Sequence, residues 1–249
     1  MPQDLTGKTA LVTGASTGLG AHFAAVLARA GAHVIVAARR KDALEKVRAV
    51  IEAEGGRASA ARLDVTSAAS IAELAPLLAD LDIVVNNAGM ARTKAFLDQS
   101  EEDWDAVIDT NLKGAFLMAK AAAQAMKAHG RGGSIINIAS ILGFRQAGAV
   151  VPYATSKAGV IQMTKALALE LARFRIRVNA IAPGYVETEL TAAFLETEAG
   201  QAMVKRIPQR RLGRLEDLEE PLLLLSSDAS SYMTGSVIVV DGGHLVSTL

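Results

Sequence analysis

The sequence contains no cysteine among its 249 residues. Disulfide bonds, thiolate catalysis and cysteine-ligated metal sites are therefore excluded. Histidine is also scarce: the four histidines are scattered, and no two lie at the spacing of a metal-ligand pair. We therefore expect no bound metal.

Neither sign of charge is in excess, because 26 lysines and arginines balance 26 aspartates and glutamates. Without a basic stripe, we expect neither nucleic acid nor an anionic membrane as the main partner. Charges or glycines interrupt every apolar run before it could span a membrane, and the start, MPQDLTGKTA, lacks the layout of a signal peptide. These absences predict a soluble, cytoplasmic protein.

Apolar residues, in contrast, are abundant and make up 51% of the chain. β-Rich runs at 9–14, 33–38 and 81–85 alternate with segments of helical periodicity, among them a long one at 101–126. Continuously apolar strands separated by helices predict a parallel sheet that is covered on both faces. With right-handed crossovers, this is a doubly wound, Rossmann-type α/β fold of about seven strands.

No linker or repeat divides the chain, so residues 1–249 are expected to form a single dinucleotide-binding catalytic domain. The least regular segment, 185–215, mixes charge with the run PQRRLGR. Its late position in the chain suits a mobile lid over the substrate.

The stretch TGASTGLG, residues 13–20, has two interpretations. Residues 14–18 fit G-x-S-x-G, the turn that presents a serine nucleophile in hydrolases. The same residues form a glycine-rich turn after the first strand, where a Rossmann fold binds phosphate. A hydrolase turn normally follows several strands, and the chain has no HGGG-type oxyanion motif. We therefore interpret Ser16 as the lining of a cofactor pocket.

Each glycine of this turn has its own expected role. Gly14 permits the tight turn, Gly18 lets the backbone approach the cofactor, and Gly20 lets the helix pack on the sheet. The positive end of that helix would face the pyrophosphate.

The end of the second strand selects between the two dinucleotides. It carries Arg39 and Arg40 and no acidic residue. A carboxylate here would bind a ribose 2′-hydroxyl, whereas an arginine can pair with a 2′-phosphate. We therefore favour NADP(H) over NAD(H), although the two arginines could instead be the solvated start of a helix.

Two further strand ends continue the pattern. Asp64 closes the third strand, where its carboxylate could accept from the adenine amino group or cap the next helix. The sequence NNAG, residues 86–89, follows the fourth strand, and its asparagines are expected to bond backbone groups where loops cross. Gly89 would let a flat ring approach the chain.

The chemistry is predicted to reside in Ser140, Tyr153 and Lys157. On a helix, Tyr153 and Lys157 lie one turn apart on the same face. A tyrosine has a pKa of about 10, and a nearby ammonium can lower it toward neutrality. Ser140, at the end of the fifth strand, could hold the substrate oxygen as charge develops on it.

In chain order, these elements resemble the short-chain dehydrogenase/reductase family, and the resemblance covers essentially the whole chain. The matching elements are TGASTGLG, Asp64-Val65, NNAG, Asn111, Ser140, YATSK at 153–157 and PGYVET at 183–188. The Y-x-x-x-K spacing differs from that of enoyl reductases, which resemble this fold but space the pair more widely.

The resemblance implies that Tyr153 is the general acid in carbonyl reduction and the base in alcohol oxidation. Lys157 would lower its pKa and bind the nicotinamide ribose, and Ser140 would polarise the carbonyl. Asn111 would hold a water that links Lys157 to solvent, although on its own it is only a polar residue within a helix. Relatives are commonly tetramers, so a homo-oligomer is expected.

The resemblance also implies a cofactor-binding set. Its members are Gly14, Ser16, Thr17, Gly18, Leu19, Gly20, Arg39, Arg40, Asp64, Val65, Asn87, Ala88, Gly89, Tyr153, Lys157, Pro183, Gly184, Val186 and Thr188. Val186 could otherwise belong to the core, and Thr188 could cap a helix.

The sequence thus predicts an NAD(P)-dependent oxidoreductase, with NADPH favoured, that interconverts a ketone and a secondary alcohol. The alternative is a non-catalytic dinucleotide-binding regulator, against which the intact serine, tyrosine and lysine argue. The substrate stays open: apolar residues within 141–151 suit an apolar substrate. Four arginines could bind an acidic group or an acyl carrier, or form a solvated face: Arg206, Arg210, Arg211 and Arg214.

Overall fold

A computed structural model describes residues 3–187 and 197–247. Its seven strands form one parallel sheet in the order β3-β2-β1-β4-β5-β6-β7. Their bounds are β1 Thr9–Thr13, β2 His33–Ala38, β3 Arg57–Arg62, β4 Ile83–Asn86, β5 Gly133–Ile138, β6 Ile176–Pro183 and β7 Val237–Val240. The predicted Rossmann-type fold is confirmed.

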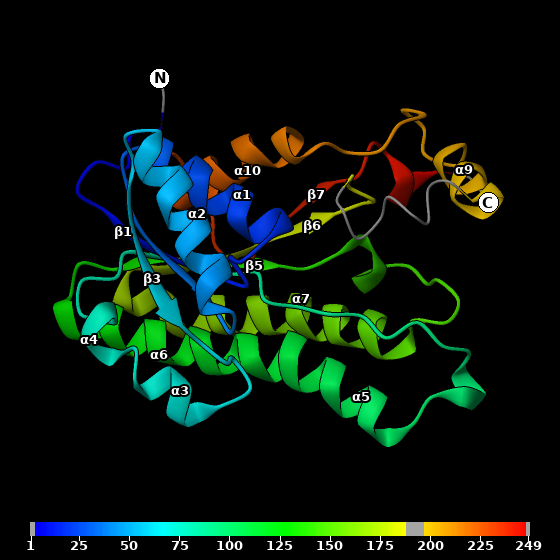
Figure 1. The fold of residues 1–249 in the computed structure, drawn as a ribbon, viewed down its shortest axis with the longest axis horizontal. Helices are drawn as coiled ribbons and strands as arrows, with labels where there is room; N and C mark the ends of the chain where they lie inside the picture. The colour runs from blue at the N-terminus through cyan, green and yellow to red at the C-terminus, as the bar shows by residue number, and fades with distance from the viewer. Residues whose placement is uncertain (1–2, 188–196, 248–249) are drawn as a thin grey trace.

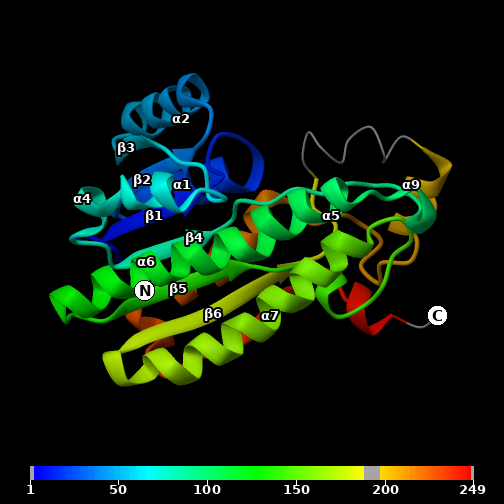
Figure 2. The same ribbon diagram turned by 90° about the horizontal axis from the view of Figure 1, so that it is seen from below.

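Helices cover both faces of the sheet (Figure 1). On one face lie α1 Gly18–Arg29, α2 Lys41–Ala53 and α10 Glu219–Ser226. On the other lie α3 Ala68–Ala72, α4 Ala75–Leu78, α5 Glu101–Ile108, α6 Gly114–His129 and α7 Val151–Leu171, with α6 and α7 side by side (Figure 2). A further helix, α9 Glu198–Val204, lies at one end of the molecule.

The core is divided between the two faces as strand geometry requires, because successive side chains point in opposite directions. In β1, Ala10 and Val12 pack into the cluster that contains Phe23 of α1, whereas Leu11 packs into the cluster that contains Met118 of α6. Burial on both faces explains why the strands read as unbroken apolar runs.

The long helix predicted at 101–126 is not uniform. A π-helical turn, Asp109–Lys113, separates α5 from α6, and Asn111 lies buried in its middle. A capping box of Ser100 and Asp103 starts α5, and Gly130 with φ of 71° ends α6. Periodicity predicted the extent of this element, but a π turn has no sequence signature of its own.

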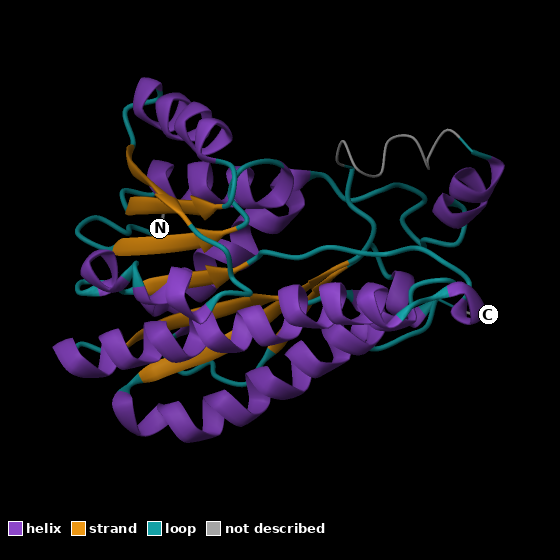
Figure 3. Ribbon diagram, turned by 60° about the horizontal axis from the view of Figure 1, so that its bottom comes forward, coloured by secondary structure: helices purple, strands orange, loops and turns teal. Residues whose placement is uncertain are grey.

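The carboxyl ends of the strands all face the end of the molecule that carries α9 (Figure 3). Of the predicted lid, residues 188–196 lie outside the described residues, and its movement stays a prediction. Within the described part of the chain, no helix is long and apolar enough to cross a membrane.

Candidate active site

The glycine turn lies at the point where the strand order reverses, between β1 and its neighbour β4. Ligands of open α/β sheets bind beyond the carboxyl ends of the strands at this switch point. Gly14 and Gly18 have φ of 67° and 57°, a conformation that favours glycine. A Cβ on Gly14 would lie 2.8 Å from the Cα of Ala88, and one on Gly20 2.4 Å from the carbonyl oxygen of Gly14.

The amino end of α1 is suited to an anion. Thr17 occupies the N-cap position, yet none of the described side chains caps this end. The N–H groups of the first turn of α1 and the positive end of its helix dipole are therefore available for a pyrophosphate. A Cβ on Gly18 would meet nothing within 4 Å, so the space beside the turn is open. The residues present thus fit a dinucleotide.

Hydrogen bonds between Asn87 and Thr13 connect the loop after β4 to this turn. The Asn87 side-chain amide donates to the carbonyl oxygen of Thr13 at 2.9 Å, and the Thr13 hydroxyl accepts from the backbone N–H groups of Asn87 and Ala88 at 3.0 Å each. The expectation that asparagine bonds backbone groups at a loop crossing is confirmed for Asn87. Asn86 points elsewhere, into a buried bond with Asn137 at 2.9 Å.

The two arginines after β2 diverge. Arg40 reaches across to the glycine turn, where Nη2 donates to the Ser16 hydroxyl at 3.1 Å and approaches that of Thr17 at 3.5 Å. Arg39 is exposed and contributes to lowering the pKa of Asp64. Arg40 is therefore not merely the solvated start of α2, and Ser16 lines the same corner.

Asp64 does not cap the next helix, because the Ser67 hydroxyl caps α3. One Asp64 oxygen accepts from the Thr66 N–H at 3.0 Å and from the Thr66 hydroxyl at 2.8 Å. These bonds are the main reason why the pKa of Asp64 is lowered. The carboxylate is thus charged and held at the end of β3, beside the buried Val65.

Tyr153 and Lys157 face one another from the first turns of α7. Lys157 Nζ lies 5.6 Å from the centre of the Tyr153 ring and donates to the carbonyl oxygen of Ile138 at 2.7 Å. Burial of Lys157 lowers its pKa to about 8. The three groups expected to do chemistry are therefore brought together, since the Ser140 hydroxyl lies close enough to Tyr153 to lower its pKa.

The expected pKa of Tyr153 is wrong in direction. Burial raises it, and the Ser140 bond only partly opposes that effect. The nearby Tyr185 phenol adds to the rise, and burial outweighs the opposing effect of Ser140. Tyr153 is therefore protonated at neutral pH, the form that a general acid requires.

Asn111 is locked in place by three hydrogen bonds. Its Oδ1 accepts from the Met90 N–H at 2.8 Å, and its Nδ2 donates to the Met90 carbonyl at 2.9 Å and to the Ser156 hydroxyl at 3.0 Å. Ser156, fully buried, donates in turn to the Tyr153 carbonyl at 2.7 Å. A Cβ on Gly89 would lie 3.4 Å from Asn111 Oδ1 and 3.7 Å from Lys157 Nζ. Sequence reasoning missed Ser156, whose only signal was a hydroxyl on the inner face of α7.

The end of β6 closes the far side of the site. Pro183 is its last residue, and a Cβ on Gly184 would lie 2.8 Å from the Cα of Asp241. Val186 is buried and bridges to Gly213. Thr188, also predicted to bind the cofactor, lies outside the described residues.

A second group of residues lies near Tyr153. Two of them, Arg145 and Tyr185, belong to the segments 141–151 and 185–215 that were expected near the substrate, whereas His244 was not expected there. The Tyr185 phenol lies close enough to help raise the pKa of Tyr153, and its ring packs on that of His244 at 5.7 Å between centres. Arg145 Nη1 donates to the His244 carbonyl oxygen and lies 3.5 Å from the Ser247 hydroxyl. An isolated cation in the apolar segment 141–151 was the signal that could have identified Arg145.

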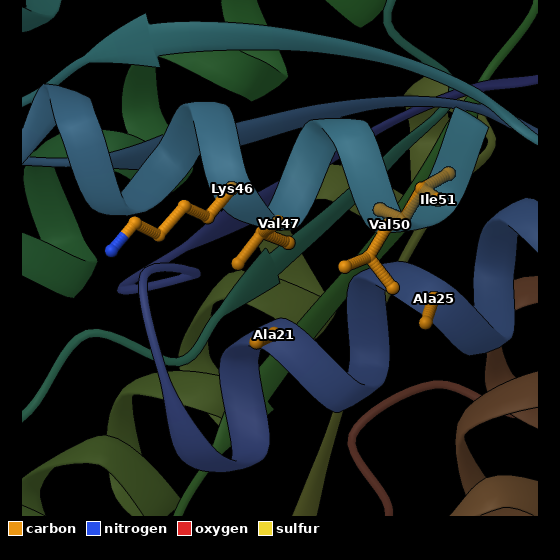
Figure 4. A pocket seen from close by; sticks show the side chains of 6 residues that line it. All are labelled: Ala21, Ala25, Lys46, Val47, Val50 and Ile51. Carbon is orange, nitrogen blue, oxygen red and sulfur yellow. The ribbon is translucent and has the colours of Figure 1, made fainter. Parts of the chain in front are cut away.

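Other features do not bear on this site. A hollow of about 260 Å³ between α1 and α2 is lined mainly by aliphatic side chains and includes none of the predicted site residues (Figure 4). Among the described residues, no cluster of histidine, aspartate and glutamate could hold a metal ion. Arg211 pairs with Asp217 at 2.6 Å, so this arginine belongs to a surface ion pair.

Comparison with known proteins agrees with this geometry. A family model described as enoyl-(acyl carrier protein) reductase matches residues 14–244. The chain is 42% identical to the 3-oxoacyl-[acyl-carrier-protein] reductase of Thermotoga maritima, with 97% of this chain and 99% of that protein covered. It is 41% identical to the 2-dehydro-3-deoxy-D-gluconate 5-dehydrogenase of Escherichia coli, with 97% and 96% covered.

A solved structure gives the same result in three dimensions. It is a gluconate 5-dehydrogenase from Burkholderia cenocepacia in complex with NADP and tartrate, with a TM-score of 0.94 and 34% identity. The alignment covers 99% of this chain and 98% of that one. With the motifs in order, the fold and these relatives in agreement, the chain belongs to the short-chain dehydrogenase/reductase family.

Proposed function

We propose that this protein is an NADP(H)-dependent oxidoreductase that interconverts a ketone and a secondary alcohol. The observation that carries the proposal is the grouping of Ser140, Tyr153 and Lys157 beside a glycine turn that fits a dinucleotide. The relatives that reduce 3-oxoacyl groups or oxidise gluconates are consistent with this reaction class.

When bound by these residues, NADPH would supply a hydride to the carbonyl carbon in the reductive direction. The Tyr153 hydroxyl donates its proton to the carbonyl oxygen, which leaves a secondary alcohol and a phenolate. Ser140 holds that oxygen, and the Lys157 ammonium stabilises the phenolate until a proton returns. Asn111 is proposed to hold a water that relays this proton from solvent. In the oxidative direction, the Tyr153 phenolate accepts the proton of the alcohol.

The preference for NADP(H) rests on Arg40. Its guanidinium already lies at the corner formed by Ser16 and Thr17, and residues 37–40 at the end of β2 include no carboxylate that would repel a phosphate. Arg39 and Asp64 are proposed to border the adenosine, and Pro183, Gly184, Val186 and Thr188 the nicotinamide end. That the solved relative binds NADP supports the assignment.

The test is to follow NADPH absorbance with a panel of ketones, and NADP reduction with the matching alcohols. We expect turnover with at least one pair, and a higher kcat/KM with NADPH than with NADH. Tight cofactor binding without turnover in either direction would identify a regulator instead. Reduction of 2-enoyl thioesters but of no ketone would identify an enoyl reductase, the activity named by the matching family model.

We also propose a homo-oligomer, a tetramer by analogy with the family. A hollow of about 350 Å³ lies between α6 and α7 and is lined by apolar and charged side chains that include Phe116, Leu167 and Phe174. The small residues of α6, in contrast, are used within the subunit, since Ala119 and Ala122 are buried there. Light scattering of the purified protein gives the mass: four chains are expected, and a monomer would contradict the proposal.

A further inference from the structure

The wall of the site beyond Tyr153 is built from three distant parts of the chain. Tyr185 comes from the end of β6, His244 from the last turn, and Arg145 from the segment that follows Ser140. The Tyr185 and His244 rings pack together, and Arg145 donates to the His244 backbone. A series of contacts thus connects the guanidinium through His244 and Tyr185 to the surroundings of Tyr153.

Some hydrogen-bond donors of Arg145 have no partner among the described residues. Only Nη1 is engaged, by the His244 carbonyl and the Ser247 hydroxyl, and no described carboxylate lies within ion-pair distance. Nε and Nη2 of the half-buried side chain therefore remain for a ligand. A guanidinium presents these donors as a rigid fork that matches the two oxygens of a carboxylate.

The surroundings of Arg145 also favour an anion. The nearby carboxylate of Asp241 is already occupied, since its two oxygens accept from the N–H groups of Gly243 and Leu245. The His244 ring is buried, and its Nδ1 has no described partner. Two cations, Arg145 and Arg206, act on that ring. Of the charged groups that act on the His244 ring, two are cations and one, Asp241, is an anion, so positive charge is in excess there.

We propose that Arg145, supported by Tyr185 and His244, forms an anion subsite that binds the carboxylate of a small oxo or hydroxy acid. The inference rests on the proposed oxidoreductase function and narrows its substrate class. A free carboxylate on a short carbon chain would be held by Arg145 while the reacting carbon lies at Tyr153. An acyl group carried on a large protein has no such free carboxylate.

The test compares acids with their neutral counterparts at fixed NADPH. The probes are the oxo acids from 4-oxopentanoate to 6-oxoheptanoate, each with its methyl ester. For at least one chain length we expect kcat/KM of the wild type to be about tenfold or more higher for the acid, the scale of one charge-assisted contact. Arg145→Gln should bring the ratio of acid to ester close to one, mainly through KM of the acid. Arg145→Lys should keep part of the wild-type preference for the acid over the ester.

Arg131→Gln is the matched control, because Arg131 pairs with Asp80 at the opposite end of the strands and its loss should leave the ratio unchanged. If Arg145→Gln does not fold at its C-terminus, the wild-type protein can still test the subsite by inhibition. Glutarate should then compete with reduction of the ester, and glutaramide should not. Reduction of esters without any preference for acids, or equal inhibition by both compounds, overturns the subsite and leaves the oxidoreductase intact. Absence of turnover with every carbonyl and alcohol overturns the proposed function itself.

Discussion

The two halves of the active site are built in different ways. On the cofactor side, the glycine turn, the NNAG loop and the end of β2 follow adjacent strands of the sheet, and bonds such as Asn87 to Thr13 join them across the strand ends. On the substrate side, Arg145, Tyr185 and His244 come from segments about 40 to 100 residues apart. The first half follows from the fold itself, whereas the second depends on residues that can change without disturbing the sheet. A shared fold can therefore keep one cofactor and vary its substrates.

The largest effect is expected at the junction of the halves, for Tyr153→Phe. Loss of the proposed general acid at the carbonyl should lower kcat about 10²- to 10⁴-fold, the usual contribution of general acid catalysis. NADPH binding, measured by fluorescence titration, should change little. Turnover that survives the substitution would remove Tyr153 from its assigned role.

On the cofactor side, Arg40→Ala should lower kcat/KM for NADPH about 10- to 100-fold, the scale of a charge-assisted contact to phosphate. The value for NADH should change much less, because NADH has no 2′-phosphate. Arg39→Ala is the matched comparison and should have the smaller effect, since Arg39 faces Asp64. Equal losses with the two cofactors would mean that Arg40 only supports the turn.

The pH dependence of carbonyl reduction should follow the protonation of Lys157. Its pKa is lowered to about 8, so the ammonium is lost as pH rises through that value. The pKa of Tyr153 is raised, so the phenol stays protonated there and cannot cause the loss. We expect kcat/KM for reduction to fall up to tenfold per pH unit above about pH 8. In Lys157→Arg the guanidinium stays charged, so the residual activity should not fall above pH 8. A wild-type kcat/KM that stays constant up to pH 9.5 would contradict the role given to Lys157.

The smallest effect is expected for Ser156→Ala. It removes the partner of Asn111 and of the Tyr153 carbonyl, which should cost about 1 kcal/mol of unfolding free energy. If Ser156 positions Asn111, kcat should also fall severalfold while KM stays constant. Thr155→Ala, one residue away and exposed, is the control. A loss of stability without any change in kcat would make Ser156 a purely structural residue.

The sequence was sufficient for the features that depend on chain order. Apolar runs predicted the strands, and β2 and β7 match their expected bounds. Helical spacing placed Tyr153 and Lys157 on one face of α7. The cross-link by Asn87 was also predictable, because a polar residue that directly follows a buried strand must satisfy its amide locally.

Other features depend on burial and on contacts between residues that are distant in the sequence. The pKa of Tyr153 was expected to fall, but burial raises it, and the degree of burial cannot be read from the spacing of two residues. The divergence of Arg39 and Arg40 requires knowing which of them faces the turn. Arg145 and His244 are 99 residues apart, so no local pattern relates them.

The π-helical turn at Asp109–Lys113 has a consequence for how this protein can change. This turn accommodates one residue more than an α-helical turn, so α5 and α6 keep their phase across it. If the same residues formed ordinary helix instead, everything on one side would be rotated by about 100° relative to the other. Either Asn111 would swing away from Met90, or Met118 and Met126 would leave the core. The wide turn thus keeps Asn111 at Met90 and the buried methionines of α6 in the core. Insertions and deletions in this family member should accumulate elsewhere and spare these five positions.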